Sequence, residues 1–231
     1  MGTMTGMDIA NRAWTKVNEE TGGTAVRWPS DEALDWINDA QREIVNLNHK
    51  AYTQRGTMSV AAGSRQELVA GGLSLAISLV DIYTLMDSAG TARLRALTRR
   101  PRAWLDDNLP TWHTTPGDPV HWVFDESEPT VFWLYPQPTQ ARKVEVAYAA
   151  SPAPLLTIES QIALADTYAN AIQYFVLFSF YSKDTSYTKS PQMATTYYQL
   201  FRDSAGAPAA STAADSAKSM TDATGQVGVA S

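Results

Sequence analysis

The sequence predicts an α+β fold: a four-helix bundle, built from two N-terminal and two C-terminal helices, with an inserted small β-rich subdomain and a flexible C-terminal arm. Apolar residues recur at helical spacing over 30–47 and again after Pro154. Between these regions the period changes to two, as at Val144, Val146 and Tyr148. Small residues dominate the last part of the chain, which cannot build a core by itself. The helical ends of the chain are therefore expected to pair with each other.

Composition sets the limits of this prediction. The chain has 231 residues, 44% of them hydrophobic, which is enough for one large domain or two modest ones. Its formal net charge of -6 argues against binding nucleic acid through a general positive field. The absence of Cys excludes disulfides, a thiol nucleophile and Cys-ligated zinc. Residues 1–10 lack the pattern of a secretory signal, and no apolar stretch reaches the ~20 residues of a membrane helix, so folding in the cytoplasm is expected.

Residues 1–52 are assigned to the two N-terminal helices. A first helix is predicted from Thr5 to Glu20, where two glycines follow. The second spans 30–47, with Ser30 as its cap and acidic residues in its first turn. Its buried stripe is expected to consist of Ala33, Ile37, Ala40, Ile44 and Leu47.

Residues 53–150 are assigned to the β-rich insert. Residues 121–124 and 131–135 flank an acidic turn at 125–129, which predicts a hairpin. Seven prolines between 101 and 138 suggest short strands and a small sheet. Pro101 is expected to start a brief helix through Leu105.

Residues 151–204 are assigned to the C-terminal helices. Thr157 is a candidate cap for a long helix that begins at Ile158 and carries two apolar stripes, which indicates two packing neighbours. The last helix is predicted to begin at Ser190 and Pro191 and to end near Gly206. Residues 205–231 are assigned to the arm, in which 19 of 27 residues are Ala, Ser, Thr or Gly.

The sequence carries no motif for nucleotide binding, for a zinc protease or for a serine hydrolase. The three histidines match no metal-ligand spacing. Several carboxylates of the insert are candidates for the acid and base of a glycoside hydrolase, although solvated or ion-paired roles are favoured. They are Asp106, Asp107, Asp118, Asp125, Glu126 and Glu128. No catalytic residue, metal or cofactor is predicted.

Aromatic residues are concentrated in the insert, and they support two interpretations. The cluster consists of Trp104, Trp112, Trp122, Phe124, Phe132, Trp133 and Tyr135. Aromatic faces can stack on sugars, so a carbohydrate-binding module is the alternative function. A core that also contacts protein is favoured. Alternation places Trp122 and Phe124 on one face and Val123 on the other, so that one face is expected to stay free.

Two charged segments are candidates for contacts between copies of the chain. One is a basic block that contains no carboxylate: Arg93, Arg95, Arg99, Arg100 and Arg102. The other is the acidic side of the second helix: Asp31, Glu32, Asp35 and Asp39. Opposite charges on different surfaces of one chain suit a head-to-tail contact that closes into a ring. A solvated loop paired locally with Asp106 and Asp107 is the alternative for the basic block.

The chain resembles the head-to-tail adaptor (connector) proteins of tailed bacteriophages. The resemblance covers roughly residues 24–206 and rests on the order of several blocks. These are DEALDWINDAQREIV at 31–45, RRPRAWLDDNLPTW at 99–112, VHWVFDESEPTVFWLYPQP at 120–138, VEVAYAASPAPL at 144–155, IALADTYANAIQYFVLFSFYSKDTSY at 162–187 and ATTYYQLF at 194–201. It departs from the family pattern at 67–69, where a Leu-Pro pair is expected after the Gln.

The resemblance implies a structural virion protein without turnover chemistry. It implies a ring, expected to be of twelve copies, in the virion neck between the portal of the head and the tail tube or nozzle, assembled in the host cytoplasm. DNA would pass through the channel without sequence-specific binding, and no membrane is involved. The arm would dock on the portal through Ala205, Pro208, Ser211, Lys218, Met220, Val227 and Val229. The hairpin would face the tail through Trp122, Phe124, Glu126, Glu128 and Trp133.

Overall fold

The computed structural model describes residues 2–18, 27–184 and 189–206. The chain divides into two compact units. The first, called here the helical unit, combines Met1–Asn48 with Ala153–Ser231. The second, the β unit, is the continuous segment His49–Pro152.

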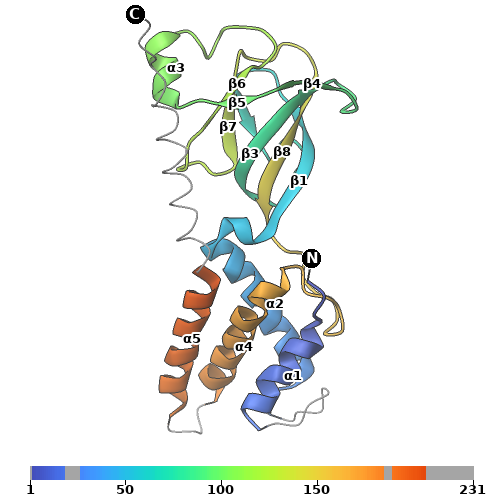
Figure 1. Ribbon diagram of the computed structural model, residues 1–231, viewed down its shortest axis with the longest axis vertical. Helices are drawn as coiled ribbons and strands as arrows, with labels where there is room; N and C mark the ends of the chain where they lie inside the picture. The colour runs from blue at the N-terminus through green and yellow to red at the C-terminus, as the bar shows by residue number, and fades with distance from the viewer. Residues whose placement is uncertain (1, 19–26, 185–188, 207–231) are drawn as a thin grey trace, which may run out of the picture. The chain divides into compact units, whose positions relative to one another are not determined.

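The helical unit contains α1 (Gly6–Lys16), α2 (Ser30–Leu47), the 3-10 turn η2 (Asp166–Tyr168), α4 (Ala169–Lys183) and α5 (Ser190–Gly206). Helix α4 packs against α1, α2 and α5 (Figure 1). The predicted stripe of α2 is confirmed from Ala33 to Ile44, whose side chains are fully buried, whereas Leu47 is 40% exposed. Pro29, and not Ser30, precedes the helix as its N-cap.

The predicted start of the long C-terminal helix at Ile158 is wrong. Helical structure begins only at η2 and α4, because the backbone of the preceding segment pairs with the N-terminal residues. Gly6 N–H donates to the Ser160 carbonyl at 3.0 Å, and Ile162 N–H donates to the Met4 carbonyl at 3.0 Å. Backbone groups that find tertiary partners do not need a helix to satisfy them.

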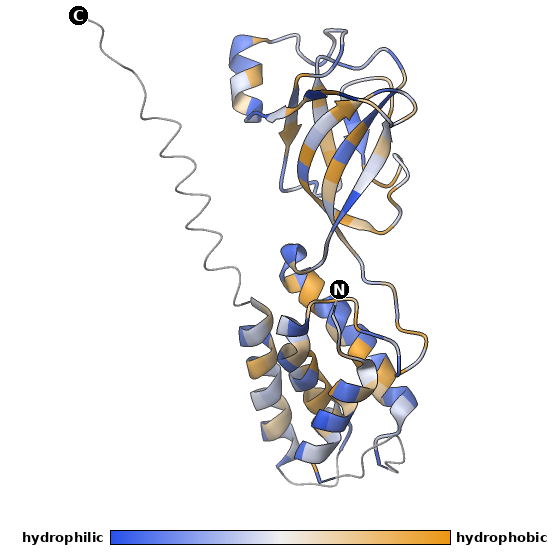
Figure 2. Ribbon diagram, turned by 45° about the vertical axis from the view of Figure 1, so that its right-hand side comes forward, coloured by the Kyte–Doolittle hydropathy of each residue, from blue (hydrophilic) through white to orange (hydrophobic). Residues whose placement is uncertain are grey.

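The β unit contains two four-stranded sheets (Figure 1). One has the order β1-β8-β3-β4 and the other β2-β7-β6-β5. In chain order the elements are η1 (His49–Tyr52), β1 (Thr53–Val60), β2 (Arg65–Glu67), β3 (Ala76–Met86), β4 (Arg93–Ala96), β5 (Thr98–Arg99), α3 (Arg102–Asn108), β6 (His121–Phe124), β7 (Val131–Tyr135) and β8 (Arg142–Ala150). Polar and apolar residues alternate along several of these strands (Figure 2).

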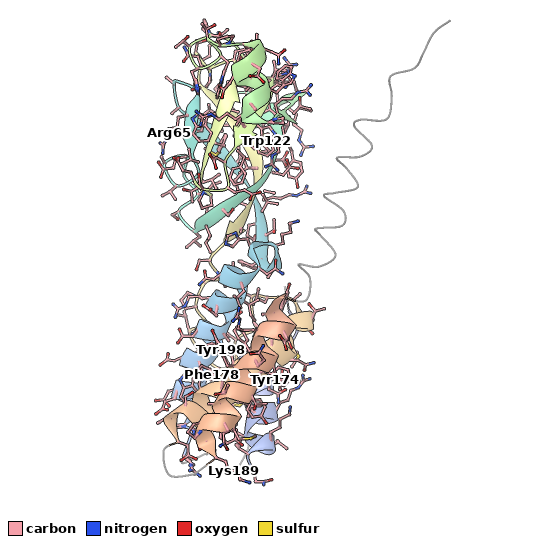
Figure 3. The ribbon with its side chains drawn as sticks, turned by 90° about the vertical axis from the view of Figure 1, so that its left-hand side faces the viewer. Arg65, Trp122, Tyr174, Phe178, Lys189 and Tyr198 are labelled. Carbon is pink, nitrogen blue, oxygen red and sulfur yellow. The ribbon has the colours of Figure 1, made fainter. Side chains whose placement is uncertain are left out.

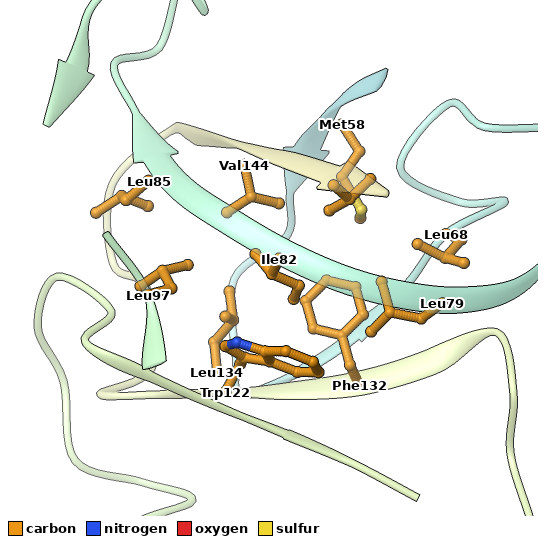
Figure 4. Close-up of a cluster of buried hydrophobic side chains, with 11 residues drawn as sticks. Met58, Leu68, Leu79, Ile82, Leu85, Leu97, Trp122, Phe132, Leu134 and Val144 are labelled. Atoms are coloured by element: carbon orange, nitrogen blue, oxygen red, sulfur yellow. The ribbon is translucent and has the colours of Figure 1, made fainter. Parts of the chain in front are cut away.

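The two sheets enclose a core of their own (Figure 4). Leu79, Ile82 and Leu85 of β3 face Trp122 of β6 and Phe132 of β7 across this core. All five side chains are less than 5% exposed to solvent. Burial of a single large apolar side chain stabilises a fold by about 1.5–3 kcal/mol, so this cluster is a main source of stability in the β unit.

The prediction of a four-helix bundle with a small β insert is therefore wrong. The described residues form an α+β structure, but with five α-helices and two sheets, and the strands make up a large part of it. The error came from the prolines, which all lie outside β1, β3 and β8. Those three strands of 8, 11 and 9 residues carry the larger sheet without interruption. Proline interferes with a strand only where it occupies a ladder position.

The smaller sheet carries a second buried cluster on its other side. Leu105 of α3 and Trp112 pack on Val123 of β6, and all three are buried. The predicted hairpin is confirmed, since β6 and β7 pair antiparallel with His121 opposite Tyr135. The brief helix after Pro101 is also confirmed, although it extends to Asn108.

Candidate functional site

The basic block forms the passage from one sheet of the β unit to the other. Arg93 and Arg95 lie in β4, which pairs with β3, while Arg99 lies in β5, which pairs in parallel with β6. Between them, Leu97 is buried in the core and its N–H donates to the Tyr83 carbonyl at 3.2 Å. The buried leucine holds the flanking arginines at the edge of both sheets.

The five arginines of the block differ in their partners. Arg93 forms an ion pair with Glu145 of β8 at 2.9 Å, and Arg102 forms one with Asp106 at 3.4 Å. Arg95, Arg99 and Arg100 have no carboxylate partner within the described ranges. The predicted local alternative, pairing with Asp106, thus accounts for one arginine, and three guanidinium groups remain uncompensated.

Two of these three arginines rest on aromatic rings. The Arg99 guanidinium lies 5.5 Å from the ring centre of Trp122 and 5.6 Å from that of Phe124. Arg100 lies 5.0 Å from the ring centre of Trp104, which is 39% exposed. A guanidinium stacked on a ring keeps its N–H edge available for a carboxylate or phosphate.

His121 lies beside this arginine group. Its ring stacks on Tyr135 at 6.3 Å and meets the edge of Trp104 at 6.0 Å, while Nδ1 lies 3.1 Å from the Thr98 hydroxyl. Burial, followed by the charges of Arg100 and Arg95, holds the pKa of His121 below its usual value. The lowered pKa favours the neutral form of the imidazole at pH 7.

The four acidic residues of α2 also differ in whether they have an ion-pair partner. Glu32 forms an ion pair with Lys183 of α4, and Asp39 forms one with Arg42. Asp31 and Asp35 are exposed and have no ion-pair partner in the parts of the chain that the structure describes. Two of the four predicted contact residues thus already have a partner within the chain.

The aromatic hairpin does not present the free face that alternation suggested. Trp122 is buried between the sheets, and Phe124 is half-buried against the same core. Val123, on the other side, is buried under α3. Trp133 is half-buried beside it, while Glu126 and Glu128 are exposed at the turn. The prediction of one free face is therefore wrong, because each side of the smaller sheet has its own cover, and Trp122 offers no platform for a sugar ring.

Three of the six carboxylates considered for hydrolysis are held by local partners. Asp106 accepts a hydrogen bond from Trp112 Nε1 at 2.8 Å, and Asp118 pairs with Arg142 at 3.1 Å. Hydrogen bonds from the backbone and hydroxyl of Ser127 lower the pKa of Asp125. A general acid needs a raised pKa, so this shift runs against catalysis.

Two absences hold for the described residues. No group of three or more His, Asp or Glu side chains among them is placed to hold a metal ion. No helix among them is long and apolar enough to cross a membrane.

The sequence predicted a second apolar stripe that includes Phe178, but not the aromatic contacts that this stripe makes between α4 and α5. Tyr174 and Phe178 of α4 and Tyr198 of α5 are half-buried (Figure 3). Phe178 and Tyr198 lie 5.0 Å apart between ring centres, and Tyr174 stacks on Tyr197 at 6.3 Å. The signal was the pair of apolar stripes on this helix, since a helix that is apolar all round needs neighbours on every side.

Most of the predicted arm lies outside the described residues, including Pro208, Ser211, Lys218, Met220, Val227 and Val229. Ala205 is the exception. It is buried within α5, which continues through Gly206, so the first two residues of the predicted arm belong to the helix.

Comparisons with curated proteins and with protein-family models bear on the identity of the chain. No match is found among curated proteins. The family model described as SU10 adaptor protein matches residues 4–226, which is nearly the whole chain and includes both units. This family is one of phage head-tail adaptors, so the resemblance seen in the sequence is confirmed. With a match of this extent, the chain belongs to the SU10 adaptor protein family.

Proposed function

We propose that this protein is a structural component of the virion neck that forms a ring, of twelve copies, between the portal of the phage head and the tail. The match to a head-tail adaptor family over residues 4–226 carries this proposal. The structure supports a binding role over catalysis, because three of its candidate acids are held by local hydrogen bonds and ion pairs. DNA leaving the head would cross the channel of the ring without sequence-specific contact.

The arm would carry the contact with the portal. Residues 207–231 follow α5 directly and contain no aromatic residue, Leu or Ile, so they are suited to bind along a partner and not to build a core. Ordering the backbone costs about 1–2 kcal/mol per residue, so a single arm should bind weakly. Once one arm of a ring has bound the portal, the other arms are held close to their own sites at high effective concentration. Their combined binding is therefore tight.

The turn of the aromatic hairpin would face the tail tube or nozzle. Its exposed Glu126 is available to a partner, Glu128 is exposed but pairs with Arg65 at 3.8 Å, and Trp122 and Phe124 support the turn from the core. The unpaired charges of α2 and of the basic block would join neighbouring copies.

The test is to mix the full chain with purified portal rings of its own phage and to measure the mass of the complex by light scattering. A complex of portal plus twelve copies is expected. A variant that ends at Gly206 keeps the whole of α5, including buried Ala205, and should remain folded by circular dichroism while no longer binding the portal. Unchanged binding of the shortened variant would remove the role of the arm, and failure of the full chain to bind any portal ring would overturn the proposed function.

A further inference from the structure

The three uncompensated arginines are a candidate binding site for carboxylates, and the side chains of two of them, Arg99 and Arg100, rest on aromatic rings. Arg95 is anchored in β4, and the N–H of Arg100 donates to the Trp122 carbonyl at 2.9 Å. Stacking on Trp104 further limits the Arg100 side chain. An arginine that is already held in place loses less conformational entropy when it forms an ion pair.

The same group is electrostatically unfavourable while it has no partner. Arg95 and Arg100 both act on His121, whose pKa they lower, so their fields overlap at one place. Like charges that share a site repel one another. An incoming pair of carboxylates would relieve this repulsion, whereas a neutral partner would not.

Helix α2 offers two carboxylates without an ion-pair partner among the described residues. Asp31 and Asp35 are four residues apart and therefore lie on the same side of the helix. Like charges at this spacing destabilise a helix unless they are compensated. Asp31 is also favoured by its place in the first turn of α2, but neither aspartate has a positive partner in the described residues, and the arginines would supply one.

We propose that Asp31 and Asp35 of one copy bind Arg95 and Arg100 of the next copy, with Trp104 and His121 forming the floor of the contact. This inference rests on the proposed ring, because it names the surfaces that join its copies. A head-to-tail contact joins two different surfaces in this way, and it closes into a ring when the rotation between copies allows it. Arg99, at the neighbouring sheet edge, adds to the positive field.

The test uses charge reversal in the full chain. The double variants D31R/D35R and R95E/R100E each place like charges on both sides of the contact. In the presence of portal rings, each should require at least about tenfold more protein for half-maximal assembly than the unaltered chain, because like charges facing each other are strongly unfavourable. The shift should shrink as salt is raised, since these side chains are exposed.

Mixing the two variants gives the decisive result. In a mixed ring with alternating copies, every contact again joins opposite charges, so two variants that fail separately should assemble together. The quadruple variant, which carries both reversals in one chain, should also assemble. If the quadruple variant assembles but the mixture does not, the arginines and aspartates meet within one chain and the proposal is overturned.

A matched control reverses two exposed carboxylates elsewhere, Glu159 and Asp203, and so changes the net charge as D31R/D35R does. The control variant E159R/D203R should assemble like the unaltered chain. Normal assembly of D31R/D35R and R95E/R100E on the portal would overturn the inference while leaving the proposed function intact. Failure of the unaltered chain to bind the portal would instead remove the proposed function.

Discussion

At the scale of single residues, the decisive property of each charge is whether it has a partner. Arg93 and Arg95 are two positions apart in one short strand, yet only Arg93 reaches a carboxylate, that of Glu145. Glu145 is 52 positions away in the sequence and comes close because β8 pairs with β3, which pairs with β4. A local charge count therefore cannot separate a structural arginine from one that is free to bind another molecule.

The pKa of His121 depends on two of the arginines that have no ion-pair partner, Arg95 and Arg100. Burial is the largest cause of its lowered pKa, and Arg100 and Arg95 contribute next. Replacing Arg100 with Gln removes one positive neighbour, so the pKa of His121 should rise towards its ordinary value of about 6.5. An NMR titration of the imidazole measures the change.

The control for this prediction is R102Q, since Arg102 is engaged with Asp106 and does not contribute to the shift at His121. The pKa of His121 should stay where it is in R102Q. Equal values in R100Q and the unaltered chain would show that Arg100 does not face the imidazole. Because the folded pKa is lowered, His121 favours the folded state above its unfolded pKa, and this contribution is lost as the pH falls towards the folded pKa.

At the scale of elements, local sequence signals and long-range contacts compete to decide at which residue a helix begins. Helix α1 follows its local signal: Thr5 Oγ1 accepts a hydrogen bond from the Asp8 N–H at 3.1 Å, and Asp8 Oδ2 accepts one from the Thr5 N–H at 2.9 Å. This reciprocal capping fixes the first residue of the helix. The segment after Thr157 also has a capping residue, but its backbone pairs with residues 4–7 and the helix starts later.

Removal of the α1 cap tests this local signal. Thr5→Ala deletes the acceptor for the Asp8 N–H and should lower the free energy of unfolding by about 1 kcal/mol, within the range of 0.5–2 kcal/mol for such caps. Urea denaturation followed by circular dichroism measures it. Thr15→Ala is the control, because the Thr15 hydroxyl only donates to the Asn11 carbonyl within the helix. Alanine is the better helix former there, so a loss as large as that of Thr5→Ala would contradict the assignment.

A second prediction at this scale concerns the stability that the core between the two sheets provides. Ile82 lies in the middle of β3 and is 2% exposed, so Ile82→Ala should cost about 2–5 kcal/mol through lost burial and a cavity. Val80→Ala, in the same strand but at a half-buried position, should cost clearly less. Comparable urea midpoints for the two variants would be inconsistent with a core at Ile82.

At the scale of the whole molecule, the chain is divided into two units with separate cores. The β unit is a continuous segment, whereas the helical unit is assembled from both ends of the chain. Each unit contributes a candidate surface: the α2 carboxylates in one and the basic block in the other. An adaptor that joins several partners can use such separate surfaces without a shared pocket.

The separate cores predict that His49–Pro152 folds by itself. Its two sheets bury a complete apolar cluster, and α3 covers the outer side of one sheet. The isolated segment should give a dispersed NMR spectrum and a single cooperative urea transition. A collapsed spectrum would mean that the β unit depends on the helical unit for its stability.

The features that the sequence by itself determined are those that depend on residues close together in the chain. It identified the stripe of α2, the β6-β7 hairpin, the helix after Pro101, the charged segments and the family, because periodicity, turn chemistry and block order are readable from neighbouring residues. These features depend on contacts within a few positions of the chain.

Only the tertiary structure decided the rest. The size of the two sheets, the late start of α4, the burial of Trp122 and the pairing of Arg93 all depend on residues far away in the sequence. The same arrangement left Arg95, Arg100, Asp31 and Asp35 without ion-pair partners in the described chain. An ion pair forms only where the fold brings two charges within about 4 Å, and no local pattern specifies that distance.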